Sequence, residues 1–245
     1  HDAGTRALLA ALLSRVSSAS CRDLMLGGGL IGLNWGIFVW AVESERVVEA
    51  SLGYFMNPLM NVFLGVVFLG EALRKAQWLA VTFAAAGVLW LTISLNAFPW
   101  VSLTLAISFA LYGLIRKVAP ASPLEGLRVE TSVLLIPAVA FVLLRGNASE
   151  NLTSDTATVI LILLSGAVTG IPLLLFASSA KRIPLSILGI LQYITPTIQF
   201  LLGVFAYSET FDSNRLIGYS IIWSGLVIFA LDSFRFASNQ ASHEK

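Results

Sequence analysis

Eight long apolar stretches divide this chain, and short polar segments separate them. Each stretch has about 20 residues, the length at which an α-helix crosses a hydrocarbon layer of roughly 30 Å. They cover residues 23–42, 47–70, 76–95, 99–117, 127–145, 156–180, 184–207 and 214–234. So little chain lies between them that no water-soluble domain fits. The pattern predicts an all-α polytopic membrane protein with eight transmembrane helices in this chain.

Composition agrees with this prediction. The chain is 57% hydrophobic and 12% charged, whereas soluble domains carry about 25% charged residues. So few charges could not cover a water-exposed surface, and the lipid bilayer is therefore an expected partner. A net charge of +1 is too small to indicate a nucleic-acid partner.

The distribution of basic residues predicts the orientation, because Lys and Arg accumulate on the cytoplasmic side of membrane proteins. With the C-terminal tail in the cytoplasm, only Arg46, Arg145 and Arg215 of the 15 basic residues lie outside. The opposite orientation would invert this ratio, so we predict a cytoplasmic C-terminus. Two sequons, at Asn147 and Asn151, then fall in the longest external loop, and the sequence leaves open whether they are glycosylated.

The chain contains an internal repeat between Gly28 and Gly87. A shift of 138 positions without a gap superimposes four glycines, one proline and one glutamate on identical residues, as the pairs Gly28 and Gly166, Gly32 and Gly170, Pro58 and Pro196, Gly65 and Gly203, Glu71 and Glu209, and Gly87 and Gly225. An odd number of crossings separates the copies, so the second copy is inverted in the membrane. Inverted repeats are typical of secondary transporters, which work by alternating access.

The repeat also predicts a domain organisation. The two helices predicted at 99–145 have no repeat copy within the chain, which begins with His1 rather than Met. We therefore expect two further helices ahead of this chain, and ten helices in two inverted five-helix repeats. The predicted divisions are a cytoplasmic lead-in at 1–22, the last three helices of the first repeat at 23–95, the second repeat at 99–235 and a cytoplasmic tail at 236–245.

Polar side chains form a stripe in each copy. Tyr54, Asn57, Asn61 and Gly65 lie on one face of a helix, and their repeat mates are Gln192, Thr195, Gln199 and Gly203. Polar groups at membrane depth are costly unless they face a cavity or a partner helix. The two stripes predict a polar cavity near the midplane. Simple hydrogen bonding between helices is the alternative.

Other residues of the spans extend this hypothesis. Pro58 and Pro196 each remove a backbone hydrogen bond and are candidate hinges, although a purely structural kink is equally open. Asn34, Trp35 and Tyr112 are further candidates for the cavity wall. Glu130 is either a solvated boundary charge, which we favour, or a carboxylate that couples transport to protons. Glu71 and Glu209 are interpreted as loop or packing residues.

The sequence offers little for catalysis. The only histidines, His1 and His243, are at the ends of the chain, and Cys21 is the single cysteine. We therefore predict no catalytic residues, no metal site and no cofactor. An intramembrane enzyme is thus disfavoured, and a non-transporting membrane assembly subunit is a further alternative.

Several motifs together resemble a known family. They are Gly32-Leu-Asn-Trp35, Glu49-Ala-Ser-Leu-Gly-Tyr54, Asn57-Pro58, Phe68-Leu-Gly-Glu71, Tyr112-Gly-Leu-Ile-Arg-Lys117, Pro184-Leu-Ser186 and Leu191-Gln-Tyr-Ile-Thr-Pro-Thr197. This pattern resembles the EamA family of drug/metabolite transporters, and within it the RarD-like branch. The resemblance implies a ten-helix permease, here in the bacterial plasma membrane, with a central cavity between its halves. Similar proteins export amino acids, metabolites or drugs.

The working hypothesis is therefore a secondary carrier for a small organic solute that works by alternating access. The predicted substrate-binding residues are Asn34, Trp35, Tyr54, Asn57, Asn61, Tyr112, Gln192, Tyr193, Thr195 and Gln199.

Overall fold

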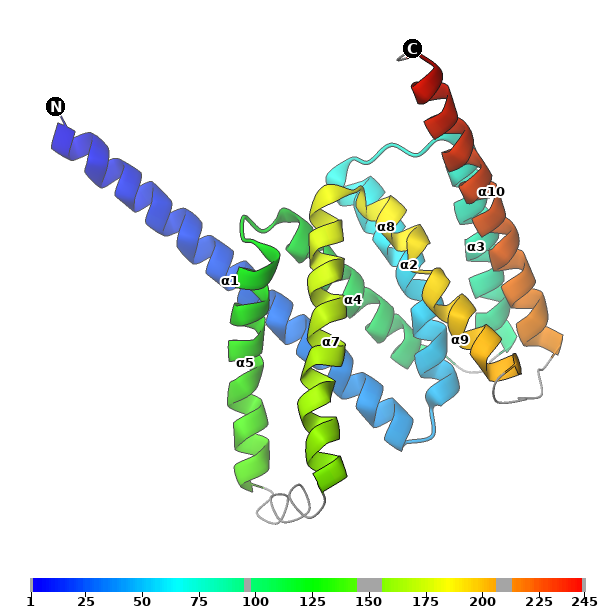
Figure 1. The fold of residues 1–245 in the computed structure, drawn as a ribbon, viewed down its shortest axis with the longest axis horizontal. Helices are drawn as coiled ribbons and strands as arrows, with labels where there is room; N and C mark the ends of the chain where they lie inside the picture. The colour runs from blue at the N-terminus through cyan, green and yellow to red at the C-terminus, as the bar shows by residue number, and fades with distance from the viewer. Residues whose placement is uncertain (1, 95–97, 145–155, 206–212, 244–245) are drawn as a thin grey trace. The chain divides into compact units, whose positions relative to one another are not determined.

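The computed structural model describes residues 2–94, 98–144, 156–205 and 213–243 (Figure 1). This part of the chain is helical and contains no strand. Its helices are α1 (Asp2–Glu43), α2 (Val47–Leu69), α3 (Lys75–Ser94), α4 (Trp100–Val118), α5 (Pro123–Leu144), α7 (Thr156–Arg182), α8 (Leu185–Leu191), α9 (Ile194–Phe205) and α10 (Ser213–His243). Arg145 and the sequons at Asn147 and Asn151 lie outside the described residues.

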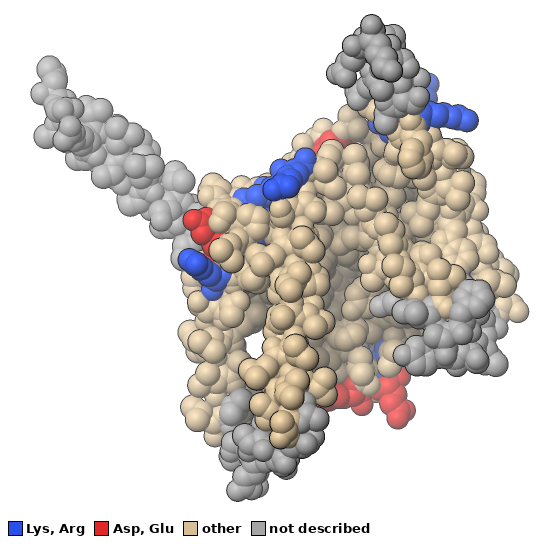
Figure 2. Space-filling model, in the orientation of Figure 1, with Lys and Arg blue, Asp and Glu red and all other residues tan. Residues whose placement is uncertain are grey.

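Six helices within the described ranges are long and apolar enough to cross a membrane. They are Arg22–Glu43, Val47–Leu69, Lys75–Ser94, Trp100–Val118, Val159–Arg182 and Ser213–Phe236. α5 covers nearly the same residues as the apolar stretch predicted at 127–145. Charged side chains occupy only small areas of the surface in Figure 2. The predicted all-α polytopic membrane fold is confirmed.

The stretch predicted as a single span at 184–207 forms α8 and α9, with a break between them just before the candidate hinge Pro196. Pro196 has no N–H, and its ring crowds the carbonyl of Gln192, four residues earlier. Around the break, the Tyr193 N–H donates to the carbonyl of Ile190 at 3.1 Å, and the Thr195 N–H donates to that of Gln192 at 3.1 Å. These tighter bonds span three residues instead of four. Pro58, the repeat mate of Pro196, lies inside the continuous helix α2.

The chain forms two compact units. The first comprises His1–Leu33 and Leu111–Ile183, and the second comprises Asn34–Ala110 and Pro184–Lys245. These units group residues by contact and do not coincide with the repeats, which group them by sequence.

In the second unit, α3 and α10 pack side by side and antiparallel (Figure 1). A Cβ atom at Gly87 would lie 2.8 Å from the carbonyl oxygen of Gly218, and a Cβ atom at Gly225 would lie 2.6 Å from that of Ala80. Gly87 and Gly225 are repeat mates, and so are Ala80 and Gly218. The two helices therefore contact each other through equivalent positions. Small residues at these positions let the two backbones approach closely.

Side chains also join α3 and α10 near both ends. Arg74 forms an ion pair with Asp232 at one end. At the other end, the indole N–H of Trp90 donates to the carbonyl of Asn214 at 3.1 Å. Between them lies an apolar core to which both helices contribute, together with α2 and the break. Its buried members are Leu52, Phe55, Ala84, Val88, Tyr193 and Ile222.

In the first unit, two lysines join the ends of α4 and α7. Lys117 Nζ donates to the carbonyls of Ala180 at 3.1 Å and Ile183 at 2.6 Å. In return, Lys181 Nζ donates to Ala119 at 2.7 Å, and also to Ala121. Each lysine thus satisfies carbonyl groups at the C-terminal end of the other helix, where the helix has no backbone partner for them.

The middle of α1 packs against α5 in the first unit. A Cβ atom at Gly28 would lie 3.1 Å from Glu130 Cα, and one at Gly32 would meet the side chain of Leu134. Gly28 and Gly32, one turn apart, therefore let α1 and α5 pack closely. Gly36, one turn further along α1, has no atom within 4 Å of its Cβ position.

Candidate functional site

Three amide side chains meet in the second unit, where the break between α8 and α9 faces α2. Asn57 Nδ2 donates to Gln192 Oε1 at 3.1 Å, and Asn61 Nδ2 donates to the same oxygen at 2.6 Å. Asn57 and Asn61 lie one turn apart on α2, and Gln192 is the first residue after α8. We call these three residues the amide cluster. The two polar stripes predicted from the sequence therefore meet at these residues.

A glycine allows α8 to come this close to α2. A Cβ atom at Gly189 would lie 2.7 Å from the carbonyl oxygen of Pro58 and 2.8 Å from Asn61 Cβ. Any larger residue would push α8 outward and lengthen the hydrogen bonds to Gln192. The candidate hinge Pro58 thus lies at the closest approach of the two segments.

The amide cluster has unused hydrogen-bonding capacity. Asn61 is fully buried and Asn57 is 8% exposed. The Oδ1 atoms of both have no hydrogen-bond partner among the described residues, and the hydroxyl of Tyr193, also buried, has none either. A buried polar group without a partner costs about 1–3 kcal/mol. Such groups in a folded protein point to a water molecule, an ion or a ligand.

Other predicted site residues of the second unit contact residues outside the amide cluster. Asn34 Nδ2 donates to the Leu105 carbonyl at 2.8 Å and to Ser108 Oγ at 2.9 Å, so it joins α1 to α4. Tyr54 packs edge-on against Phe38, with 6.0 Å between ring centroids.

Two further candidates, Trp35 and Thr195, are exposed. The side chain of Gln199 lies outside the described residues.

The remaining candidates, Tyr112 and Glu130, belong to the first unit. Glu130 is 2% exposed and lies 3.4 Å from Nη1 of Arg116, which is also buried. The hydroxyl of Tyr112 donates to Glu130 Oε2 at 3.2 Å. The favoured interpretation of Glu130 as a solvated boundary charge is therefore wrong, because its partner lies with it inside the protein.

Arg116 was not among the predicted site residues. Its Nη2 atom donates to the carbonyl of Pro123 at 2.7 Å. Its guanidinium fills the space that a side chain at position 126 would need, so Gly126 is required there. The sequence did contain a signal for this contact. Arg116 ends one apolar stretch, Gly126 follows it, and Glu130 lies inside the next apolar stretch.

Glu71 has a larger role than the loop or packing residue expected from the sequence. Its carboxylate accepts hydrogen bonds from the N–H of Leu185 at 2.7 Å, the N–H of Ser186 at 2.8 Å and Ser186 Oγ at 2.7 Å. It therefore caps the N-terminus of α8, where backbone donors have no partner within the helix. Its repeat mate Glu209 lies outside the described residues.

The loop geometry that places Glu71 depends on two glycines. Gly70 ends α2 with φ +65°, a conformation that favours glycine. The Glu71 N–H then donates to the carbonyl of Gly65 at 3.0 Å. A Cβ atom at Gly65 would lie 2.5 Å from Glu71 Oε2. The Phe68-Leu-Gly-Glu71 motif thus positions a carboxylate at the N-terminus of α8.

Taken together, these features define a class of protein. Long apolar helices, a helix broken beside a buried amide cluster, and a close pair of helices in contact through equivalent positions are features of polytopic membrane transporters. No group of three or more His, Cys, Asp or Glu side chains comes together in the part of the chain that the structure describes.

Comparison with known proteins identifies the family. The model of the EamA-like transporter family matches residues 7–93 and 99–231. The chain belongs to the EamA-like transporter family. It is therefore an integral membrane protein and a membrane transporter of the drug/metabolite superfamily.

Several bacterial proteins are similar to this chain. Protein RarD of Streptomyces exfoliatus is 45% identical over 214 residues, which make up 86% of this chain and 68% of the relative. The uncharacterized transporter YojE of Bacillus subtilis is 41% identical over 90% of this chain and 74% of its own length. The chloramphenicol-sensitive protein RarD of Pseudomonas aeruginosa is 34% identical over 88% of this chain and 72% of its own length. The predicted RarD-like resemblance is confirmed.

A solved structure has the same fold. It is a crystal structure, and it superimposes on this chain with a TM-score of 0.61 at 17% identity. The match covers 94% of this chain and 95% of the chain in the crystal structure. At this level of identity the likeness concerns the fold alone.

Proposed function

We propose that this chain is a secondary carrier that moves a small organic metabolite, an amino acid or an amphipathic drug by alternating access through a central polar cavity. The observation that carries the proposal is the amide cluster. Two asparagines of one repeat bond the glutamine of the other, and both asparagine oxygens remain without a described partner. A polar solute could supply the missing hydrogen bonds at this depth.

The two copies of the repeat support alternating access in a second way. α3 and α10 contact each other through equivalent positions, as expected for a pair related by a pseudo-two-fold axis. By contrast, α2 is continuous, whereas its copy is split into α8 and α9. In a carrier with inverted repeats, the two halves adopt different conformations and exchange them to open the cavity on the other side. The difference between α2 and α8–α9 fits one such state.

The rest of the hypothesis from the sequence belongs to this proposal. It includes two inverted five-helix repeats, with helices at 23–95 and 99–235, and cytoplasmic segments at 1–22 and 236–245. Tyr193 follows Gln192 in the sequence and has a buried hydroxyl without a described partner. The remaining proposed cavity residues are Asn34, Trp35, Tyr54, Tyr112, Thr195 and Gln199.

Glu130 is the proposed site of coupling to protons. It is a buried carboxylate held by Arg116 and Tyr112, and protonation would remove the charge on which the ion pair depends. The matching test replaces Glu130 with Gln, which keeps the shape and removes the titrating group. We expect Glu130→Gln to abolish the stimulation of transport by a pH gradient while exchange of labelled for unlabelled solute continues. Equal stimulation of the wild type and the variant would rule out this role.

Transport by the purified protein in proteoliposomes tests the main proposal. The screen covers amino acids, other metabolites and amphipathic drugs, with and without a pH gradient. We expect Asn61→Ala and Gln192→Ala to lower the transport rate at least tenfold. The matched control is Gln77→Ala, a buried amide of α3 that bonds only the Arg74 N–H among the described residues.

Three results would count against the proposal. Wild-type rates in correctly inserted Asn61→Ala and Gln192→Ala proteins would reject the amide cluster. Binding of solutes without flux, or without exchange, would favour a non-transporting subunit, and chemical conversion of a solute would favour an intramembrane enzyme.

A further inference from the structure

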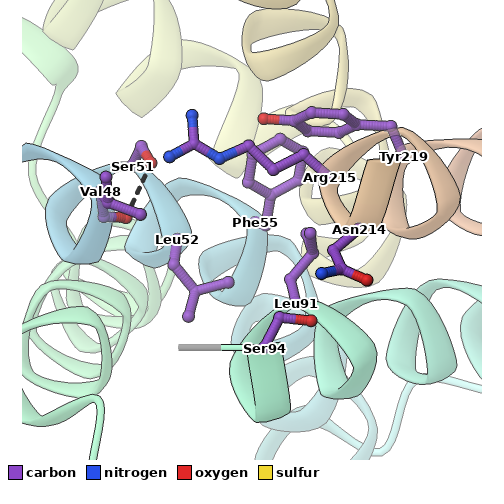
Figure 3. A pocket seen from close by; sticks show the side chains of 9 residues that line it. All are labelled: Val48, Ser51, Leu52, Phe55, Leu91, Ser94, Asn214, Arg215 and Tyr219. Atoms are coloured by element: carbon purple, nitrogen blue, oxygen red, sulfur yellow. Dashed lines mark hydrogen bonds between the residues drawn. The ribbon is translucent and has the colours of Figure 1, made fainter. Parts of the chain in front are cut away.

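A pocket opens in the second unit where the N-terminal ends of α2 and α10 meet the C-terminal end of α3 (Figure 3). Its volume is about 140 Å³. It is lined by Val48, Ser51, Leu52, Phe55, Leu91, Ser94, Asn214, Arg215 and Tyr219. None of these residues belongs to the amide cluster.

One wall of the pocket carries a positive charge that no described carboxylate neutralises. Figure 3 shows the Arg215 side chain reaching from α10 into the pocket. Arg46, also predicted on the outer side, has its charge paired: it lies 3.7 Å from Glu49, and 5.6 Å from the ring centroids of Trp40 and Trp100. Arg215 has no ion pair of this kind with any residue in the described ranges. It is therefore the better candidate to bind an anion.

Part of the lining is apolar, beside the polar side chains of Ser51, Ser94 and Asn214. Leu52 and Phe55 of α2 and Leu91 of α3 form this part, and the ring of Tyr219 packs against Phe55 with 4.9 Å between centroids. Leu52 and Phe55 also belong to the buried core of this unit, which fixes their positions. The pocket thus combines one guanidinium with a rigid apolar surface that suits an aliphatic chain.

We propose that this pocket binds small monocarboxylates that carry a short aliphatic chain. The guanidinium of Arg215 has the fork geometry that takes both carboxylate oxygens, and the aliphatic chain lies on Leu52 and Phe55. We expect phosphate to bind less tightly, because some of its oxygens would lie against the side chains of Leu52 and Phe55. The volume is also too small for a drug-sized molecule, whose pockets begin at roughly 300 Å³. The site is thus an accessory to any central cavity.

The test measures binding, so its outcome does not depend on transport. The purified protein is placed in phosphatidylcholine nanodiscs and titrated with butyrate, using calorimetry and ligand-detected NMR. We expect a Kd on the order of 1 mM, which is a typical strength for a ligand of so few heavy atoms. Butyramide, the neutral analogue, should bind at least tenfold more weakly. Acetate, which lacks two methylene groups, should bind about 16-fold more weakly than butyrate, because each buried methylene group contributes about a factor of four.

Two variants locate the site. Arg215→Gln should abolish measurable binding of butyrate, and Arg46→Gln, which removes the paired arginine at the same end of α2, should leave it unchanged. Nanodiscs that contain phosphatidylglycerol should bind butyrate as well as phosphatidylcholine discs do.

Four results would overturn the proposal. The first is equal binding of butyrate and butyramide by the wild type. The second is retained binding in Arg215→Gln. The third is binding of inorganic phosphate as tight as that of butyrate, and the fourth is loss of butyrate binding in phosphatidylglycerol discs. The last result would assign the pocket to lipid phosphate.

Discussion

α2 and the pair α8–α9 are copies of one sequence pattern, yet they have different conformations. Both copies begin at equivalent positions, Val47 and Leu185, and both carry a proline at the same place in the pattern. α2 continues through Pro58, whereas its copy is interrupted before Pro196. A proline is thus compatible with either state, and the surroundings must decide between them.

The surroundings of the two copies differ at two points. The N-terminus of α8 is capped by the Glu71 carboxylate, whereas the N-cap of α2, Arg46, makes no capping hydrogen bond with its side chain. At the break, Gln192 accepts hydrogen bonds from two asparagines of α2. The cap and the amide cluster therefore stabilise the broken form of one copy. Substitutions that disturb these contacts should show how much each one contributes.

The largest expected effect comes from a larger side chain at Gly189, where α8 lies close against α2. Gly189→Leu would place side-chain atoms where the Pro58 carbonyl and Asn61 Cβ now lie. Overpacking of this kind costs about 1–3 kcal/mol or more, and we expect a loss of at least that much in the free energy of unfolding. Unfolding of the detergent-solubilised protein by added SDS, followed by circular dichroism, measures it.

Gly36→Leu is the matched control for this change. Gly36 lies inside a helix of the same unit and has no atom within 4 Å of its Cβ position. The control should lose less than about 0.5 kcal/mol, as surface substitutions do. Equal losses in the two variants would mean that the contact between α8 and α2 is not what positions the break.

Removing the cap of α8 should have the next largest effect. Glu71→Ala deletes an acceptor that serves two backbone N–H groups and a hydroxyl. We expect a cost of about 2 kcal/mol, because caps are worth roughly 1 kcal/mol and hydrogen bonds to charged groups are stronger. Glu71→Gln keeps one acceptor oxygen and should cost about half as much. Hydrogen exchange at residues 185–188 should rise in the same order.

An exposed glutamate provides the control for the cap. Glu43→Ala, at the end of α1, should change neither stability nor exchange in α8. Unchanged exchange at 185–188 in Glu71→Ala would show that the start of α8 is held by packing alone.

The hydrophobic pattern predicted the helices well, because each membrane crossing needs its own apolar stretch. It could not reveal the break at Gln192, since the residues on both sides of the break are equally apolar. Pro196 was an available signal, but Pro58 carries the same signal in a continuous helix. Local sequence therefore locates a place where a helix can break, and tertiary contacts decide whether it does.

The same distinction between local sequence and tertiary contacts applies to the candidate site. Helical periodicity placed Asn57 and Asn61 on one face, which is a local property, and the structure brings Gln192 to that face. The role of Glu71 was missed because its partners are more than 100 residues away in the sequence. The burial of Glu130 was missed because a charge near the end of an apolar stretch looks solvated until its partner Arg116 is placed.

The amide cluster should contribute little to stability. Hydrogen bonds between membrane helices contribute about 0.6 kcal/mol on average. We therefore expect a coupling energy of about that size between Asn61 and Gln192 in a double-mutant cycle built from Asn61→Ala and Gln192→Ala. The same variants should lose most of their transport activity. A coupling energy near 2 kcal/mol with normal transport would instead identify the cluster as a structural contact.

The smallest expected effect distinguishes proline from its surroundings as the cause of the break. Pro196→Ala restores a backbone donor, and Pro58→Ala does the same in α2. If the cap and the amide cluster hold the break, the amide restored at position 196 in Pro196→Ala should exchange fast, and the free energy of unfolding should change by less than the roughly 0.6 kcal/mol expected of the amide cluster. Pro58→Ala, in a helix that is already continuous, is the control. Slow exchange of the amide at position 196 in Pro196→Ala would show that the proline itself interrupts this helix, because the same contacts would then be too weak to keep Gln192 at the break.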